Sequence, residues 1–288
     1  MEYADYKNLL TGRYTEYPAA ISVETLCLCN ANCTFCAYRG VKRKGTKLPD
    51  ELIRKIIDEL RDFPGDIPFL FVPCRVNEPF LDRRLTGILE EVAQHLPNVK
   101  VNLFTNGSVW SKEDMAKVID VGNTNLVNIS FNYHTKKEYE VNMGLPYELV
   151  LDKVDTFHSL MRDRRFPFSV KVSRVGDGTE QDQAFYDFVD RRWPGFKSAV
   201  HPHFHWISSS GANGDSDVFA CIQWFRINIL ADGQVAFCCI DDHGAHALGN
   251  IRTHSMLEIY NAPQNRARHQ VLTSRKQVTP CCRCDCHQ

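Results

Sequence analysis

The sequence predicts an α/β protein: a partial, TIM-like (β/α)6 barrel followed by a small C-terminal extension made of a β-hairpin and a helix. Short apolar runs alternate with helical patterns from residue 20 to about residue 206, which is typical of β/α units around a parallel sheet. A Ser/Gly/Asp-rich segment at 208–217 then interrupts this pattern, and the tail that follows does not continue the alternation of strands and helices. We therefore expect an N-terminal extension at 1–19, a barrel at 20–207 and a C-terminal domain at 208–288.

The predicted barrel strands are short apolar runs, and the helices between them have apolar residues at helical spacing. The clearest helix begins after Pro49-Asp50, because Leu52, Ile53, Ile56, Ile57 and Leu60 form one stripe. The strands are expected near 20–27, 68–72, 99–104, 126–131, 168–174 and 198–206. The other helices are expected near 81–96, 111–121, 147–164 and 181–192.

The C-terminal tail predicts a hairpin and one short helix. Residues 224–230 and 234–238 flank an Asp232-Gly233 turn, and a helix is expected around 255–261. These roughly 80 residues hold too few apolar side chains for a large core of their own. We therefore expect a bound metal to stabilise the tail.

Composition and charge exclude several classes of protein. Apolar residues make up 43% and charged residues 24%, which argues against disorder, collagen and coiled coil. The net charge of -1 gives no reason to expect a nucleic-acid partner. The first residues lack the pattern of a signal peptide, and no stretch of about 18 apolar residues predicts a membrane span. We therefore expect a cytoplasmic protein, in which the twelve cysteines are metal ligands rather than disulfides.

Three cysteines follow the first predicted strand with the spacing C-x3-C-x2-C, at Cys29, Cys33 and Cys36. Functional loops of β/α barrels lie at this end of the strands. Three thiolates from one loop can each bind one iron of a [4Fe-4S] cube, which leaves the fourth iron open. The spacing differs from that of zinc pairs and of ferredoxins.

At these residues the chain resembles the radical S-adenosylmethionine (SAM) superfamily, and the resemblance extends over nearly the whole chain. It implies that the amino and carboxylate groups of SAM bind the open iron. One electron from the cluster then cleaves SAM to methionine and a 5'-deoxyadenosyl radical, which removes a hydrogen atom from the substrate. It also implies an electron donor of the flavodoxin or ferredoxin type.

The resemblance assigns SAM-binding roles to residues at the predicted ends of the strands. Glu78 lies in Pro73-Cys74-Arg75-Val76-Asn77-Glu78-Pro79, where the family has a Gly-Gly-Glu-Pro-like turn for the methionine amino group; here only Glu-Pro matches, and a surface turn is the alternative. Arg174 is expected to pair with the SAM carboxylate. The full expected set is Phe35, Glu78, Asn106, Ser130, Asn132, Ser173 and Arg174.

A second group of cysteines lies in the tail. Cys221, Cys238 or Cys239, Cys281 and Cys284 supply four thiols, enough for a complete [4Fe-4S] cluster or for a zinc ion. Their order resembles the twitch or shortened SPASM extension of radical SAM enzymes, which implies a second [4Fe-4S] cluster. The preferred ligands are Cys221, Cys238, Cys281 and Cys284; the crowding of Cys281, Cys282, Cys284 and Cys286 leaves the choice open.

Five thiols remain after this assignment, and two of them are candidates for catalysis. Cys74 ends a predicted strand and Cys239 adjoins the second cluster, so either one can face the pocket and donate a hydrogen atom to a substrate radical. Packing is the alternative for any one of the leftover thiols. These are Cys27, Cys74, Cys239, Cys282 and Cys286.

Candidate substrate ligands are polar side chains near the strand ends. His201, His203 and His205 alternate along the sixth predicted strand and so share a face, either toward the lumen or outward. With the other polar candidates, they suggest a polar, sugar-like small molecule. The candidates are His134, His203, His205, Asp241 and Asp242.

The auxiliary-cluster group of the superfamily includes dehydrogenases of aminocyclitols and epimerases of aminoglycosides. A dehydrogenase passes an electron to the auxiliary cluster, whereas an epimerase returns a hydrogen atom from a thiol. The leftover thiols favour an epimerase acting on a sugar, aminoglycoside or aminocyclitol, with a dehydrogenase as the alternative. A peptide-modifying enzyme is less expected, because 19 residues before the barrel are too few for a leader-binding domain. A maturase that modifies a protein residue is a further alternative. The non-enzyme alternative is an iron-sulfur electron-transfer protein. Such a protein should lack a loop that leaves one iron open, and this chain has the C-x3-C-x2-C loop.

Overall fold

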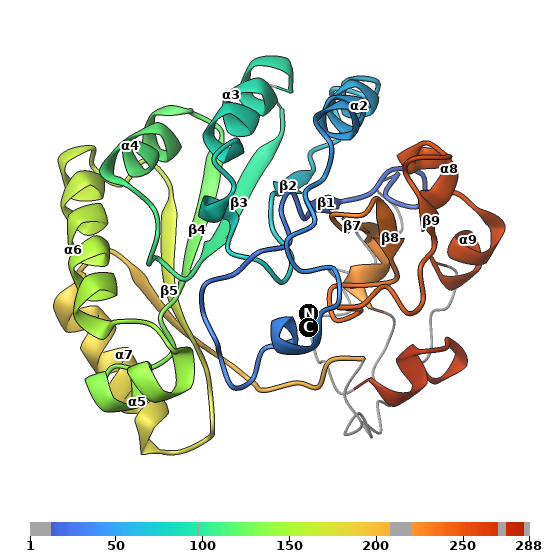
Figure 1. The fold of residues 1–288 in the computed structure, drawn as a ribbon. Helices are drawn as coiled ribbons and strands as arrows, with labels where there is room; N and C mark the ends of the chain where they lie inside the picture. Colours follow the sequence, from blue (N-terminus) through green and yellow to red (C-terminus); the bar gives the residue numbers. More distant parts are fainter. Residues whose placement is uncertain (1–12, 97, 208–220, 270–274, 285–288) are drawn as a thin grey trace.

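One mixed sheet forms the centre of the protein. The computed structural model describes residues 13–96, 98–207, 221–269 and 275–284 (Figure 1). Across these residues nine strands pair in the order β6-β5-β4-β3-β2-β1-β7-β8-β9. The first six are parallel, as the sequence predicts: β1 (Ala20–Val23), β2 (Leu70–Val72), β3 (Lys100–Thr105), β4 (Thr124–Ser130), β5 (Ser169–Val175) and β6 (Lys197–His201).

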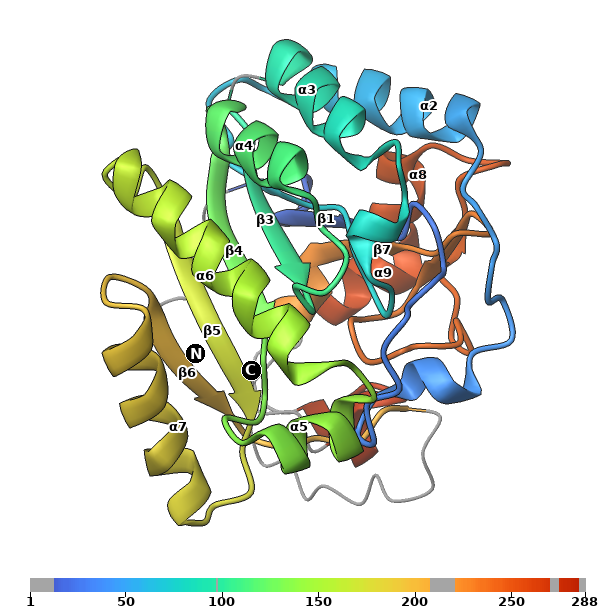
Figure 2. The same cartoon turned by 60° about the vertical axis from the view of Figure 1, so that its left-hand side comes forward.

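Helices cover the outer face of this sheet (Figures 1 and 2). The five predicted helices are present, and each buries its apolar stripe; in α2 the buried residues are the five of the predicted stripe. They are α2 (Asp50–Arg61), α3 (Leu85–His95), α4 (Lys112–Asp120), α6 (Tyr147–Asp163) and α7 (Glu180–Arg192). A further helix, α5 (Lys136–Met143), and the single turns η1 (Ala37–Gly40) and η2 (Pro79–Leu81) lie in loops at the carboxyl ends of strands.

Two barrel strands are shorter than the sequence predicts. β1 ends at Val23 rather than at Cys27, and β6 ends at His201. Pro202 follows β6 directly and has no N–H for a strand ladder. His203 and His205 therefore lie beyond the strand, and the expectation that three histidines alternate along it is wrong.

The C-terminal hairpin is present, and it continues the barrel sheet. β7 (Arg226–Ile229) pairs with β8 (Gln234–Ala236) in antiparallel fashion, and Gly233 in the turn has φ +89, which a glycine adopts readily. β7 also pairs in parallel with β1, so the tail joins the sheet at its first strand. The remaining elements are β9 (Gly249–Asn250), α8 (Met256–Tyr260), α9 (Pro263–His269), η3 (Ile222–Phe225), η4 (Arg275–Gln277) and η5 (Cys281–Arg283).

The buried apolar side chains of the described residues form one large core, a separate cluster in the tail and a small cluster beside the cysteine loop, around Cys27 and Tyr38. The large core lies between the sheet and its helices. The tail cluster combines aromatic side chains with cysteines: Cys221, Trp224, Phe225, Phe237, Cys238, Ile240 and Cys281. The expected break at 208–217 and Cys286 lie outside the described residues.

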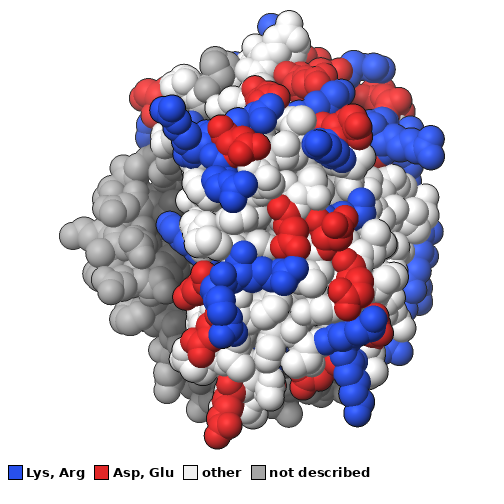
Figure 3. Space-filling model, turned by 90° about the vertical axis from the view of Figure 1, so that its left-hand side faces the viewer, with Lys and Arg blue, Asp and Glu red and all other residues white. Residues whose placement is uncertain are grey.

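The outer surface carries mixed charge. The face in Figure 3 shows Lys and Arg interspersed with Asp and Glu. Some of these charges pair, as Arg192 does with Asp155 at 2.6 Å between α7 and α6. Within the part of the chain that the structure describes, no helix is long and apolar enough to cross a membrane.

Candidate active site

A cavity of about 390 Å³ opens at the carboxyl ends of β1 to β4 and is closed on one side by the tail. This is the end of the strands where β/α barrels carry their chemistry. Most of the residues expected from the sequence to hold SAM or donate hydrogen line this cavity. They are Cys29, Cys33, Phe35, Cys36, Cys74, Glu78, Asn106, Ser130, Asn132 and Cys239.

The loop that carries Cys29, Cys33 and Cys36 is fixed to α5 by its backbone. The N–H of Asn32 donates to the carbonyl of Met143 at 2.8 Å, and the N–H of Thr34 donates to that of Asn142 at 3.0 Å. Gly144 ends α5 with φ +66, and a Cβ there would lie 3.1 Å from the Cβ of Asn32. A glycine thus permits the close approach of loop and helix.

The three loop thiols lie close enough to affect one another. Burial raises the pKa of Cys33 to about 12, and the neighbouring Cys36 and Cys29 add to the rise. Burial likewise raises the pKa of Cys29 to about 11. Three such thiols become thiolates only beside strong positive charge, which iron supplies. They therefore fit a cluster.

Across the described residues, no three His, Cys, Asp or Glu side chains gather as ligands of one metal ion would. The thiolates of a [4Fe-4S] cube bind different irons and so do not converge on one point.

Glu78 lies at the floor of the cavity and is fully buried. Thr105 Oγ1 donates to its Oε1 at 2.8 Å, the N–H of Asn106 donates to its Oε2 at 2.6 Å, and the N–H of Phe80 donates to its Oε1 at 3.2 Å. Burial nevertheless raises the pKa of Glu78 to about 7. Burial disfavours the charged form of this carboxyl group, so a cationic ligand such as an ammonium group would stabilise its carboxylate form.

Asn106, Ser130 and Asn132 line the same cavity, as the sequence predicts. The amide nitrogen of Asn106 donates to Asn30 Oδ1 at 3.0 Å and lies 4.0 Å from Cys29 Sγ, so it links the third strand to the cysteine loop. Asn132 adopts φ +61, a left-handed conformation that asparagine tolerates, and its Oδ1 accepts from the N–H of Val175.

Ser173 and Arg174 are turned away from the cavity. Ser173 Oγ accepts a hydrogen bond from Asn128 Nδ2 at 2.8 Å. Arg174 is 2% exposed and pairs with Asp182 at 2.7 Å and Asp177 at 2.5 Å. Two carboxylates already occupy its guanidinium, so the expectation that Arg174 pairs with the SAM carboxylate is wrong.

The expected substrate ligands do not line the cavity either. In the segment after β6, Phe204 and Trp206 face it, whereas His203 and His205 pack edge to face against each other at 5.4 Å. His134 packs on Phe188 at 6.0 Å, and burial lowers its pKa.

Asp241 and Asp242 are fully buried in the turn after the hairpin. Asp241 accepts from the N–H groups of Phe237, Ala245 and His246 at 2.9 to 3.2 Å, so its carboxylate holds the turn together. Asp242 Oδ2 lies 2.5 Å from His243 Nδ1. Neither aspartate lines the cavity.

Two arginines, Arg75 and Arg226, also line the cavity, and no role for either is expected from the sequence. Arg75 follows β2 inside the Glu78 motif, and Arg226 begins β7. Arg226 and Asn228 are polar residues two positions apart in an otherwise apolar strand. Because alternate strand residues share a face, this pattern was the signal for a lumen-facing site.

The four preferred tail cysteines come together in the second apolar cluster. Burial raises the pKa of Cys281 to about 12, and the nearby thiols of Cys221 and Cys284 add to the rise. Burial also raises the pKa of Cys238, and the neighbouring thiols of Cys239, Cys281 and Cys221 add to the rise. A cavity of about 280 Å³ adjoins Cys238, Cys281, Cys282 and Cys284.

Positive charge and a hydrogen-bond donor surround these tail thiols. Trp224 Nε1 donates to Cys281 Sγ at 3.4 Å, and Arg275 donates to Cys284 Sγ at 3.9 Å. Arg268 is 3% exposed, lies 4.7 Å from the Phe237 ring and is electrostatically coupled to Cys238, Cys281 and Cys221. This donor set fits a negatively charged thiolate cluster.

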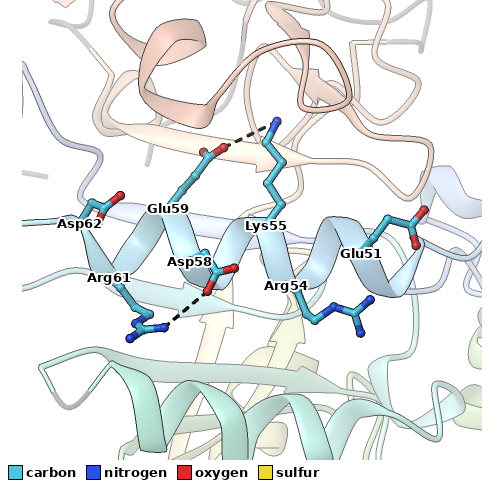
Figure 4. Close-up of a pocket in the computed structure, with 7 residues that line it drawn as sticks. All are labelled: Glu51, Arg54, Lys55, Asp58, Glu59, Arg61 and Asp62. Atoms are coloured by element: carbon cyan, nitrogen blue, oxygen red, sulfur yellow. Dashed lines mark ion pairs between the residues drawn. The ribbon is translucent and has the colours of Figure 1, made fainter.

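A larger hollow of about 730 Å³ lies along α2 but has only charged walls (Figure 4). Lys55 pairs with Glu59 at 3.6 Å there and also donates to the carbonyls of Ile251 and His254. The side chains of this hollow therefore join α2 to the tail, and its lining contains no thiol.

Comparison with known families identifies the class of protein. Residues 23–191 match the radical SAM superfamily, and residues 221–287 match an iron-sulfur cluster-binding domain, SPASM. The first match covers more than half of the chain, so the chain belongs to the radical SAM superfamily. Its cofactors are SAM and [4Fe-4S] clusters, and the tail binds a cluster rather than zinc.

Individual relatives are more distant. An S-adenosyl-L-methionine-dependent 2-deoxy-scyllo-inosamine dehydrogenase of Niallia circulans is 27% identical over 105 residues, 35% of this chain and 40% of that relative. The match thus spans about two fifths of the relative's length.

Solved structures share the fold over most of the chain. BtrN in complex with AdoMet and 2-DOIA has a TM-score of 0.59 at 14% identity, covering 93% of both chains. Streptococcus suis SuiB bound to the precursor peptide SuiA has a TM-score of 0.65 at 12% identity, covering 98% of this chain and 73% of that one. Native anSMEcpe with bound AdoMet has a TM-score of 0.64 at 16% identity, covering 86% and 82%.

Proposed function

We propose that this protein is a radical SAM epimerase that inverts a carbon of a sugar, aminoglycoside or aminocyclitol. The observation that carries this proposal is that two thiols outside the C-x3-C-x2-C motif, Cys74 and Cys239, line the same cavity as Cys29, Cys33 and Cys36. When bound, the cluster and SAM supply a radical that removes a hydrogen atom from the substrate. A thiol in the same cavity can return one from another direction.

Cys74 is suited to hold a hydrogen atom. It follows β2, is 6% exposed, and burial raises its pKa to about 12. It therefore stays an S–H group at neutral pH, as a hydrogen-atom donor must. Donation leaves a sulfur radical, so each turnover also needs one electron and one proton to restore the thiol.

The remaining roles follow the arrangement of the two cysteine groups. We assign the SAM-binding cluster to Cys29, Cys33 and Cys36, and we assign contacts to SAM to Phe35, Glu78, Asn106, Ser130 and Asn132. The auxiliary cluster is assigned to Cys221, Cys238, Cys281 and Cys284. Cys239 is coupled to Cys221 and Cys284 as well as to the cavity arginines, so it lies between the auxiliary cluster and the substrate space.

A flavodoxin- or ferredoxin-type protein is the proposed electron donor. Arg39, Lys42, Lys44 and Lys47 are exposed within the segment that follows Cys36, and no ion pair joins them to an acidic side chain among the described residues. Such donors are acidic, so this segment complements their charge. Reduction by the protein donor should therefore slow as ionic strength rises, whereas the electrons supplied per SAM cleaved stay the same.

A dehydrogenase is the second candidate, favoured by the 27% identity to the Niallia circulans enzyme. In that case the substrate radical loses a proton and passes an electron to the auxiliary cluster. The product is then a ketone and no solvent hydrogen enters the carbon.

Turnover in deuterated solvent separates the two candidates, with a substrate found by screening aminocyclitols, aminoglycosides and simple sugars. Epimerisation predicts one deuterium at the inverted carbon. Either Cys74→Ala or Cys239→Ala should still cleave SAM but lose at least about 100-fold in product formation, an effect of roughly 3 kcal/mol. Cys27→Ala is the control, because Cys27 is a buried thiol that does not line the cavity. Its iron content is measured as well, since Cys29 and Cys36 belong to the same apolar cluster as Cys27. A ketone product, or full activity in both variants, contradicts epimerisation by a thiol.

A further inference from the structure

Two guanidinium groups line the cavity at the end where Cys239 lies. Arg75 comes from the loop after β2, and Arg226 comes from the first position of β7. Each guanidinium group lies near enough to Cys239 to interact with its thiol electrostatically, and the two guanidinium groups also interact with each other. Two like charges are thus held close together from separate elements, an arrangement that costs free energy unless something negative lies between them.

The protein supplies little to satisfy these groups. Arg226 makes no side-chain hydrogen bond or ion pair with any described residue. Arg75 donates to Asn228 Oδ1 at 2.8 Å and to the carbonyl of Cys238 at 3.0 Å, which leaves its buried Nε without an acceptor. The amide nitrogen of Asn77, also in the cavity wall, is likewise buried without an acceptor.

The nearby acids and thiols do not account for this surplus of donors. Among the described residues lining the cavity, Glu78 is the one carboxylate, and it accepts hydrogen bonds from Thr105, Asn106 and Phe80. The tail thiols already have two other buried cations beside them, Arg268 and Arg275. Cys221 also lies near Arg226, but Arg226 has no hydrogen-bond or ion-pair partner among the described residues, so its guanidinium remains available to a ligand.

We propose that Arg75 and Arg226 form a subsite for an anionic group of the substrate, a carboxylate or a phosphate. Planar guanidinium groups bind such oxyanions through paired N–H donors. Two donors of this part of the lining, Arg75 Nε and Asn77 Nδ2, lack acceptors, which matches a ligand that carries acceptor oxygens.

This inference rests on the proposed function and narrows its substrate class. An oxyanion held by these arginines places the rest of a sugar-like ring toward Cys74, Cys239 and the cysteine loop, which line the same space. An ammonium group at the same position would face two cations and be repelled. The substrate is therefore an acidic ring compound rather than one whose only charged group is an amine.

The test is equilibrium binding of four matched ring probes to the anaerobically reconstituted full chain with SAM present: glucose, glucosamine, glucuronic acid and glucose 6-phosphate. At least one acidic probe should bind more tightly than glucose, and glucosamine should bind most weakly. The carboxylate and phosphate probes show which oxyanion fits. Arg226→Gln should weaken binding of the preferred acid by on the order of 10- to 100-fold, the loss of a charge-assisted hydrogen bond.

Two further variants keep the test specific. Arg226→Lys retains the charge and should retain part of the preference. Arg191→Gln removes an exposed arginine of α7 outside the cavity and should leave binding of all four probes unchanged. A preference for the neutral or amino sugar, no binding of either acid, or an acid preference that survives in Arg226→Gln overturns the proposal.

A separate readout tests whether Arg226 instead balances the charge of the auxiliary cluster. If Arg226→Gln alters the electron paramagnetic resonance signal of that cluster while acid binding is unchanged, the subsite is overturned. Formation of 5'-deoxyadenosine from SAM and dithionite tests the proposed function without any ring probe. The radical chemistry and the anion subsite can therefore fail independently.

Discussion

The two cysteine groups of this protein are built in opposite ways. Cys29, Cys33 and Cys36 come from one short loop, are partly exposed and face the cavity that Glu78 and Asn106 also line. Cys221, Cys238, Cys281 and Cys284 come from three distant segments and lie among Trp and Phe side chains. A cluster on the first group would have room for a further ligand, whereas a cluster on the second group would be enclosed by aromatic side chains.

The charges around the two groups differ as well. Burial raises the pKa of the loop thiols most, and the charged groups that add to the rise are other thiols, Glu78 and Asp242. Positive charge there therefore has to come from iron and SAM. The tail thiols have Arg268, Arg275 and the indole N–H of Trp224 beside them. The comparison indicates a reactive site in the barrel and a stabilised one in the tail.

The largest expected effect is a difference between variants of the two cysteine groups: one variant should lose catalysis, and the other should lose stability. Cys33→Ala should lose about four irons per chain, one cube, with little change in melting temperature. Cys281→Ala should also lose about four irons but destabilise the tail, because its apolar cluster surrounds the ligands. Iron analysis and thermal unfolding measure both. Equal destabilisation by the two variants contradicts the comparison, and Cys27→Ala serves as a control that keeps all irons.

A smaller effect is expected from Glu78 and depends on pH. Burial raises the pKa of Glu78 from 4.5 to about 7, so its contribution to stability without SAM is fully present below pH 4.5 and is lost as pH rises through about 7. SAM binding should show the reverse trend, because its ammonium group favours the carboxylate.

Glu78→Gln tests this by calorimetry across that pH range. The variant should lose the pH dependence of SAM binding and bind SAM roughly 10- to 100-fold more weakly. The same pH dependence in wild type and variant contradicts a role for Glu78 in SAM binding.

The sequence predicted features that depend on local pattern. The parallel strands, the helices and the hairpin follow from periodicity and turn residues, and the cysteine loop follows from its spacing. Cys74 was correctly expected at the cavity because it directly follows a strand. Each of these inferences needs only neighbouring residues.

Features set by distant contacts were not predictable. Arg174 forms ion pairs with Asp177 and Asp182 and does not line the cavity. Asp241 accepts hydrogen bonds from three backbone N–H groups, which meet only once the turn has folded. The parallel pairing of β7 with β1, which brings Arg226 into the lumen, joins residues about 200 positions apart. No local pattern contains that information.

The smallest expected effect concerns the indole beside Cys281. Trp224→Phe removes one N–H donor to the thiolate and should lower the reduction potential of the auxiliary cluster by about 40 mV, the equivalent of roughly 1 kcal/mol for one electron. Redox titration monitored by electron paramagnetic resonance measures this shift. Trp193→Phe is the matched control, because it loses a hydrogen bond to Asp155 in the helical layer. An equal shift in both variants contradicts the assignment of Cys281.

The most direct test of the division of labour is the formation of 5'-deoxyadenosine by three anaerobically reconstituted proteins with SAM and dithionite. Wild type should form it, Cys281→Ala should form it at a reduced rate, and Cys33→Ala should form none. Cleavage of SAM by Cys33→Ala, or no cleavage by wild type, would contradict the assignment of the radical-generating cluster to the loop of Cys29, Cys33 and Cys36.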